Sequence, residues 1–183
     1  MEKDGFAMKN PPHYQPDVWD NRYVCAATNC YAYAANDPYG HFMGGEQVPG
    51  LAAGARMGAV TPGECVRCAE ADGMVFIGDA PVARPGHYLV ALRICPGVDF
   101  HFIRQDADGL WSHKNGTGGI DRMDDCGRAI TNPETASFEI CSEFVGYFHV
   151  PNCGLRVAER LQEEPQAKSG WREWIQSFLP KGW

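Results

Sequence analysis

A cysteine and two histidines stand where the sequence could support nucleophilic catalysis. Cys30 follows Asn29 at a predicted helix start, where free backbone N–H groups favour the thiolate. His101 lies between two phenylalanines on a predicted strand, and His113 lies on the next strand, across the turn signal Asp106-Ala107-Asp108-Gly109. A base that is oriented by a second polar group is the arrangement of a catalytic triad. We therefore expect Cys30 to be the nucleophile, His101 the general base and His113 the orienting residue.

Each of these residues also has a structural interpretation. A cysteine is most often a small buried hydrophobic residue, and a strand histidine is most often a hydrogen-bonded structural residue. The register between the two strands is open as well. If Ala107 and Asp108 form the centre of the turn, His101 pairs with Lys114, whereas a one-residue bulge or another turn would bring the histidines opposite each other.

Three further residues are candidates for the oxyanion hole or for substrate binding. The backbone N–H of Cys30 would be the main oxyanion donor, and a second donor should come from the segment before the helix. Asp99 lies two residues before His101 and would raise the pKa of that imidazole if both side chains share a face. The predicted set is Tyr23, Asn29 and Asp99.

Helices and strands that could position these residues follow from hydrophobic periodicity and from breaker residues. A helix should run from Cys30 to Ala35 and end before Pro38, and a second helix, capped by Thr61, should cover 62–72. The β patterns form a predicted antiparallel meander with a further strand near the end. These strands are 87–95, 100–105, 110–114 and 144–150, with a short one at 74–77.

The remaining segments are expected to be irregular or helical additions to one domain, 1–183. Residues 1–23 are rich in Pro and Asn and should form an extended lead-in, and 39–59 should be a long surface loop. The core is predicted to span about 24–150. A C-terminal helical extension covers about 153–183, with helices at 153–164 and 171–178.

The order of these elements resembles the NlpC-type branch of the papain-like cysteine hydrolases. The matching segments are Asn29-Cys30-Tyr31, Arg84-Pro85-Gly86, His101-Phe102-Ile103 and Trp111-Ser112-His113, within the range 28–114. The resemblance implies an α+β, papain-like fold in which an N-terminal catalytic helix packs on an antiparallel β-sheet meander. It also implies a cysteine peptidase or amidase that cleaves an amide bond through a Cys-His-His triad and an acyl-enzyme intermediate. The substrate would be a peptidoglycan peptide, or a protein target of a secreted bacterial effector or toxin.

Two alternatives to hydrolysis stay open. The Asn29-Cys30 start is closer to lecithin-retinol-acyltransferase-like relatives, which favours thiol-based acyl transfer on the same fold. A non-catalytic binding domain with a structural metal at Cys65-Val66-Arg67-Cys68 is the other alternative, although zinc would need two further ligands. Cysteines that simply pack inside a helix are the preferred interpretation of this pair, so no metal site and no cofactor are predicted.

Charge and cysteine content limit the partners and the compartment. The formal net charge is -7 and there is no long run of Lys or Arg, which argues against nucleic acid as a partner. No signal sequence and no membrane-spanning segment are visible, so the protein is expected to be cytoplasmic as made, with export by a signal-independent route. Its eight cysteines are then expected to be mostly free thiols. The predicted partners are a peptide substrate and an inhibitor or immunity protein.

Overall fold

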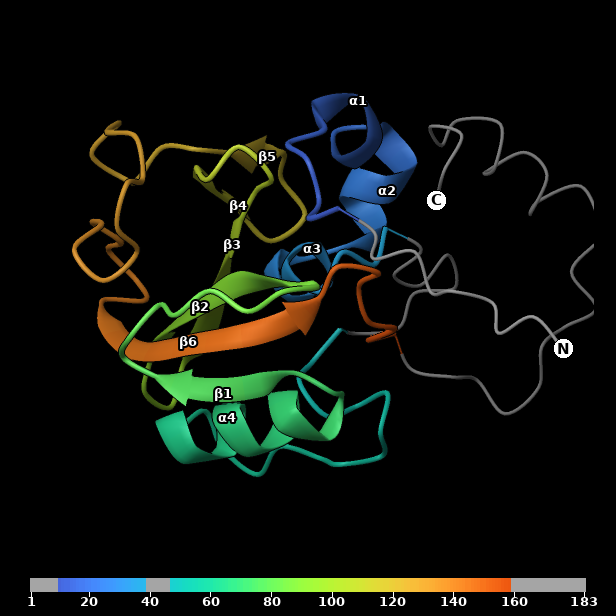
Figure 1. Ribbon diagram of the computed structural model, residues 1–183. Coiled ribbons are helices and arrows are strands. Elements are labelled where there is room, and N and C mark those ends of the chain that lie inside the picture. The colour runs from blue at the N-terminus through green and yellow to red at the C-terminus, as the bar shows by residue number, and fades with distance from the viewer. Residues whose placement is uncertain (1–9, 39–46, 159–183) are drawn as a thin grey trace, which may run out of the picture.

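A six-stranded antiparallel sheet forms the centre of the molecule. The computed structural model describes residues 10–38 and 47–158, and the strands of this part lie in the order β1-β6-β2-β3-β4-β5 (Figure 1). Four consecutive strands, β2 to β5, are neighbours, whereas β6 returns to lie between β1 and β2. The bounds are β1 Val75–Gly78, β2 His87–Cys95, β3 Asp99–Gln105, β4 Trp111–Lys114, β5 Ile120–Asp121 and β6 Glu143–Pro151.

The helices are short and surround this sheet. Within the described residues they are α1 Pro16–Trp19, α2 Arg22–Ala27, α3 Cys30–Ala34 and α4 Pro62–Ala71. Figure 1 shows α4 beside β1 at one end of the sheet, and α1 and α2 at the opposite end. Between them, α3 packs against β3 and β4. The helix that carries Cys30 therefore lies against the strands that carry the histidines.

The predicted papain-like fold with an N-terminal catalytic helix is wrong. The structure consists mainly of the antiparallel sheet, and α3 has five residues only. Helix α3 ends at Ala34 because Asn36 adopts a left-handed conformation with φ of 55° and Pro38 follows. Two α-helices also precede Cys30, so this residue does not begin the helical part of the chain.

Individual elements were predicted with mixed success. The helix at Cys30, the second helix and the five predicted strands are confirmed to within one or two residues, whereas the short strand β5 was not predicted. The extended lead-in is wrong after residue 15, because Pro16 occupies the first turn of α1 and Asn21 caps α2. The predicted helix at 153–164 is wrong for 153–158, which is turn and irregular chain, and 159–183 lies outside the described residues. The described part of the predicted loop, 47–59, contains no helix or strand.

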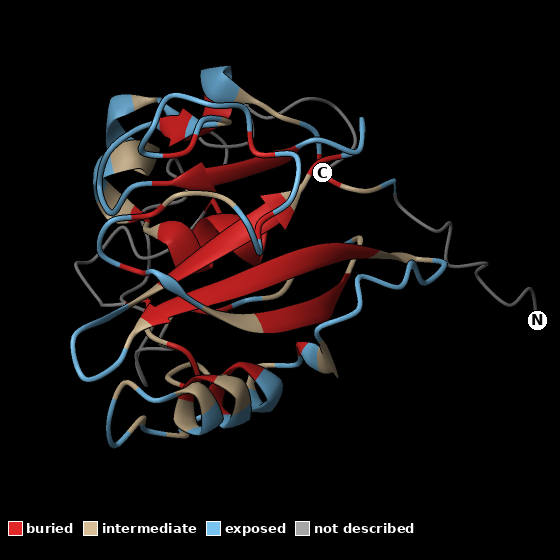
Figure 2. Cartoon of the chain, turned by 90° about the vertical axis from the view of Figure 1, so that its left-hand side faces the viewer, coloured by how far each residue is buried: buried red, intermediate tan, exposed pale blue. Residues whose placement is uncertain are grey.

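Strand β2 is buried on both faces of the sheet, as its nearly continuous apolar sequence predicts. Its even-numbered residues from Tyr88 to Ile94 pack against α3 and α4 in one cluster with Phe102 and Phe148. Its residues Leu89 and Ala91 face the other way, toward Phe138, in a second cluster. Figure 2 shows this pattern as buried central strands and a buried α3 beneath exposed loops. The chain after β5 thus covers one face and the helices cover the other.

Two buried cations connect the N-terminal helices to the sheet. The ammonium of Lys114, which is fully buried, donates hydrogen bonds to the carbonyl oxygens of Cys25 at 2.9 Å, Thr28 at 2.8 Å and Gly116 at 2.7 Å. Burial lowers the pKa of this ammonium. Lys114 therefore fixes the turn between α2 and α3, directly before Cys30.

Arg104 is the second buried cation, and it connects α3 to β3. Its guanidinium is fully buried and donates to both the carbonyl and the hydroxyl oxygen of Tyr33, at 3.1 and 2.9 Å. Its charge is balanced by Asp106 at 3.0 Å, and Arg122 approaches the second oxygen of that carboxylate at 3.1 Å. Loss of either partner of a buried ion pair strongly destabilises the fold, because it leaves an unpaired buried charge. These residues therefore specify how α3 packs on β3.

We expect Lys114→Met to lower the free energy of unfolding by about 3 kcal/mol, because the buried carbonyl oxygen of Thr28 and the partly buried ones of Cys25 and Gly116 lose their donor. Urea unfolding followed by intrinsic fluorescence measures the loss. Arg84→Met is the matched control, since Arg84 is exposed, and it should change stability by less than about 0.5 kcal/mol. Equal losses in the two variants would contradict the structural role given to Lys114.

Candidate functional site

Asn29 fixes the start of α3 and thereby the position of Cys30. Its side-chain oxygen accepts hydrogen bonds from the backbone N–H groups of Tyr31 at 3.0 Å and Ala32 at 3.1 Å. Its side-chain nitrogen donates to the carbonyl oxygen of Gln47 at 2.8 Å. Asn29 therefore caps α3, and Cys30 occupies the first helical position.

The thiol of Cys30 is nevertheless a poor thiolate. Its side chain is buried, and Sγ donates a weak hydrogen bond to the carbonyl oxygen of Phe100 at 3.7 Å. Burial raises its pKa to about 12, the negative charge of Asp99 adds to the increase, and the backbone N–H of Phe102 offsets part of it. A helix of five residues has too weak a dipole to reverse this. Cys30 is therefore a neutral thiol at physiological pH.

The two histidines are diagonal neighbours on one face of the sheet. The observed register pairs His113 with Ile103, one residue away from the register that a two-residue turn would give. The reason is a three-residue connection between Asp106 and Leu110, in which Gly109 adopts φ of 83°. With this register His101 and His113 point to the same side, and the predicted proximity is confirmed: His101 Nε2 lies 2.9 Å from His113 Nδ1.

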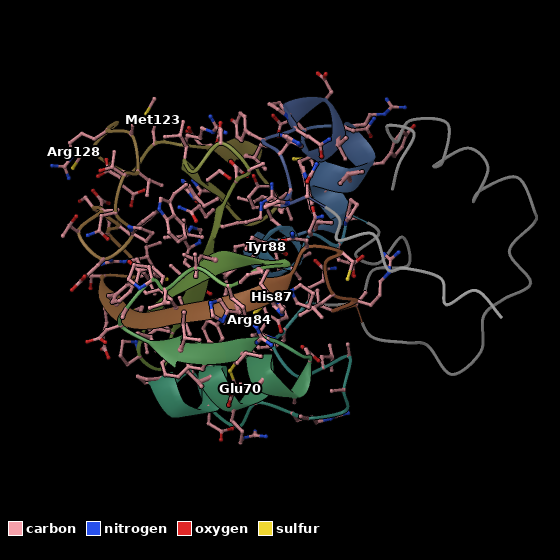
Figure 3. All side chains as sticks on the ribbon, in the orientation of Figure 1. Glu70, Arg84, His87, Tyr88, Met123 and Arg128 are labelled. Carbon is pink, nitrogen blue, oxygen red and sulfur yellow. The ribbon has the colours of Figure 1, made fainter. Side chains whose placement is uncertain are left out.

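One set of tautomers satisfies both histidines. His113 Nε2 lies 2.9 Å from the carbonyl oxygen of Met123, which can only accept, so this nitrogen carries the proton. His113 Nδ1 is then an acceptor, and His101 Nε2 donates to it. Figure 3 shows Met123 beyond the sheet, on the opposite side of the molecule from Glu70 of α4. The chain that follows β5 therefore completes the hydrogen bonding of the histidine pair.

Phe138 covers both imidazole rings from the same segment. Its ring centroid lies 5.1 Å from that of His101 and 5.3 Å from that of His113. Burial lowers the pKa of His101 to about 3, and electrostatic interactions with the neighbouring His113 and with the Arg93 guanidinium lower it further. The upward shift predicted from Asp99 is wrong in direction. His101 is thus a neutral imidazole rather than one half of a thiolate–imidazolium pair.

The covering segment is held by Arg93, a residue that sequence analysis overlooked. Its guanidinium donates to the carbonyl oxygens of Cys141 at 2.8 Å, Pro133 at 2.7 Å and Glu134 at 3.0 Å, and also to that of Ser142. An arginine inside an otherwise apolar strand was the available signal, because a buried guanidinium must find several acceptors. The acceptors themselves lie 40 to 49 residues away, and the sequence does not identify them.

Tyr23 and Asp99, the other predicted site residues, form local hydrogen bonds. The backbone N–H of Tyr23 donates to the side chain of Asn21 at 3.1 Å, and its own side chain is exposed. The carboxylate of Asp99 accepts from the backbone N–H of Phe100 at 2.8 Å. Neither of these two hydrogen bonds involves Cys30 or the histidine pair.

The cysteines of the predicted metal alternative pack inside α4. Cys65 and Cys68 are fully buried, with the Cys65 thiol 3.5 Å from the sulfur of Met57. Within residues 10–38 and 47–158, no group of three His, Cys, Asp or Glu side chains could hold a metal ion. In the same part of the chain, no helix is long and apolar enough to cross a membrane.

Fold and site together define a small domain dominated by an antiparallel sheet, whose thiol and paired histidines are built into its interior. The chain is 36% identical over 137 residues to insoluble matrix shell protein 1 of Ruditapes philippinarum, a match that covers 75% of this chain and 88% of the relative. The chain belongs to the same family as that protein. No protein-family model and no solved structure matches the chain.

This family membership overturns the predicted function. A cysteine hydrolase acting on peptides or peptidoglycan is wrong, and so are the associated descriptions as a protease, amidase, bacterial effector or toxin, because the relative is a shell matrix protein. The neutral states of Cys30 and His101 agree with this correction. Acyl transfer would also need a Cys30 thiolate, and the raised pKa of the buried thiol argues against it as well.

Cys30 should react slowly with alkylating agents at neutral pH. We expect iodoacetamide at pH 7 to modify the exposed Cys126 and Cys153 at least about tenfold faster than Cys30, because burial excludes the reagent and raises the thiol pKa. Mass spectrometry of timed samples gives the rate at each cysteine. Rapid labelling of Cys30 below pH 7, lost in His101→Ala, would instead show an activated thiol.

Acid should destabilise the protein through His101. The folded-state pKa of about 3 lies below the ordinary value of about 6.5, so the unfolded chain binds the proton more readily. The contribution of neutral His101 to the free energy of unfolding is fully present well above pH 6.5 and is lost as the pH decreases toward 3. From pH 7 to pH 5 this amounts to about 2 kcal/mol.

Urea unfolding at the two pH values measures this loss, and His101→Gln should remove most of it. The partly exposed His87 provides the control variant, His87→Gln, which should keep the wild-type pH dependence. An unchanged pH dependence in His101→Gln would contradict the assignment of the buried proton-binding site.

Proposed function

We propose that this protein is a structural component of an insoluble extracellular matrix. The observation that carries the proposal is its kinship with insoluble matrix shell protein 1, which extends over most of both chains rather than over one short motif. A shared fold of this extent makes a shared structural role the most direct interpretation.

The interior of the domain supports a structural role. The polar groups that could have been catalytic are used in internal hydrogen bonds, from Cys30 to Phe100 and from His101 through His113 to Met123. The Cys30 contact connects segments 70 residues apart, and the histidine contacts connect β3 to β4 and β4 to the chain after β5. They stabilise the packing of α3, the sheet and the segment after β5, which is the task of a matrix component that must keep its shape.

A matrix role also bears on the compartment. It requires export, and a signal-independent route is the one expected from the sequence. It also places the protein in contact with other extracellular components rather than with a peptide substrate. Enzymatic activity at Cys30 stays a prediction that the alkylation experiment addresses. The absence of nucleic acid among the partners likewise stays a prediction.

Sequential extraction of the producing tissue tests the proposal. An antibody against this chain should find the protein in the residue that remains after saline and non-ionic detergent, with release only by a denaturant such as guanidinium chloride. A cytosolic enzyme of the same tissue, followed in the same fractions, is the control and should appear in the saline extract. Recovery of this protein with that enzyme in the saline extract would contradict the matrix role.

A further inference from the structure

Two further histidines meet near the start of β2. In the antiparallel pairing of β2 with β6, His87 is opposite Pro151 and His149 is opposite Leu89. Opposing residues share a face of the sheet, as do residues two apart on a strand, so His87 and His149 are diagonal neighbours on one face. Their ring centroids are 5.9 Å apart, with an interplanar angle of 60°. The fold thus brings together two imidazoles that are far apart in the sequence.

The connection between β1 and β2, residues 79–86, binds one nitrogen of each ring. His149 Nε2 lies 2.6 Å from the carbonyl oxygen of Val82, and His87 Nδ1 lies 3.1 Å from that of Pro85. A carbonyl oxygen can only accept a hydrogen bond, so each of these nitrogens carries the proton of its ring. In the neutral rings, the lone pairs are then on His87 Nε2 and His149 Nδ1.

Neither lone pair accepts a hydrogen bond from the described residues. In this part of the chain, the two rings bond only to the carbonyl oxygens of the connection. The interior pair differs, because His101 donates directly to His113. A histidine that binds a metal ion commonly has one nitrogen that donates to a carbonyl oxygen, which fixes the tautomer and the ring orientation, while the other nitrogen contacts the ion. Both rings of the surface pair meet this requirement.

This corner of the sheet borders solvent. His87 is partly exposed, and His149 is 8% exposed. Val75, which is opposite His149 on β1, and Val82 of the connection are both exposed. Figure 3 shows His87 beside the exposed Arg84, where the connection enters β2. An ion from solution therefore reaches the pair from the side of His87.

The separation of the rings suits two ligands of one ion. With metal–nitrogen bonds of about 2.0 to 2.1 Å, two imidazoles on a tetrahedral ion have centroids about 5 Å apart, and a wider angle at the ion gives about 6 Å. The observed separation of 5.9 Å lies within this range. A small rotation of the partly exposed His87 ring adjusts the angle.

We propose that His87 Nε2 and His149 Nδ1 bind a divalent transition-metal ion of the class of Zn(II) and Cu(II). Imidazole nitrogen suits these ions, whereas Ca²⁺ and Mg²⁺ require oxygen ligands. The described residues contain no group of three His, Cys, Asp or Glu side chains that could hold an ion, so water completes the coordination. The ion joins β2 to β6. The inference goes beyond the proposed matrix function and does not depend on it.

Nitrogen-15 NMR of the imidazole side chains in the purified full chain tests the inference. In metal-free buffer, the spectra should show the proton on Nδ1 of His87 and on Nε2 of His149. Added Zn(II) should shift the resonances of His87 Nε2 and His149 Nδ1 together, without a matching shift at the exposed His13. Because the readout is specific for each nitrogen, Zn(II) bound by exposed thiols does not imitate this result. Unchanged resonances at both nitrogens, or a shift at His87 alone, would overturn the inference.

Matched variants distinguish a shared ion from an ion on a single imidazole. In His149→Gln, the amide nitrogen still provides a donor for the carbonyl oxygen of Val82, but the ligand nitrogen is gone. This variant should weaken Zn(II) binding at His87 at least about tenfold, because two linked ligands bind far more tightly than one. His13→Gln is the control and should keep the wild-type affinity. Equal affinity at His87 in the wild type and in His149→Gln would contradict the shared site.

The reciprocal variant keeps the test independent of any effect of His149→Gln on folding. His87→Gln changes a partly exposed position, and it should remove the Zn(II)-dependent shift at His149 Nδ1. A persistent shift there would show that His149 binds the ion without His87 and would overturn the inference.

Discussion

Burial of β2 on both faces is the constraint on which the remainder of the structure depends. A strand in this position needs apolar cover on each side, and the helices α3 and α4 provide it on one face. The other face is covered by irregular chain around Phe138. Arg93 interrupts the apolar strand on that side, and its guanidinium must be met by backbone carbonyl oxygens. The covering segment is therefore held by polar contacts as well as by packing.

The same cover determines the chemistry of the cysteine and the histidines. Their residue types and order match those of a thiol enzyme, but a nucleophilic pair needs a thiolate that is stabilised by positive charge. Burial under Phe138 and beside Arg93 keeps His101 neutral, and burial of Cys30 keeps the thiol protonated. Desolvation here outweighs both the helix start and the neighbouring imidazole, and the three residues contribute hydrogen bonds and packing.

Buried polar groups of this kind suit the proposed matrix role. Lys114 and Arg104 fix the N-terminal helices, and the histidine pair fixes the segment after β5, so each peripheral part is bonded to the central sheet. Such contacts add little net stability when complete, but they penalise alternative arrangements because any displaced partner is left buried and unsatisfied. A component of an insoluble matrix benefits from a single arrangement of this sort.

The local elements follow from short-range patterns in the amino-acid sequence. Apolar runs and turn residues located most strands, Thr61 and Pro62 located α4, and Asn29 located the start of α3, because caps and strand patterns act over a few residues. The sequence also brought His101 and His113 together, since one short turn connects them. The return of β6 between β1 and β2 and the cover over the histidines became visible in the folded chain alone. These depend on partners far away in the chain, and it is their burial, which no local pattern encodes, that sets the protonation of Cys30 and His101.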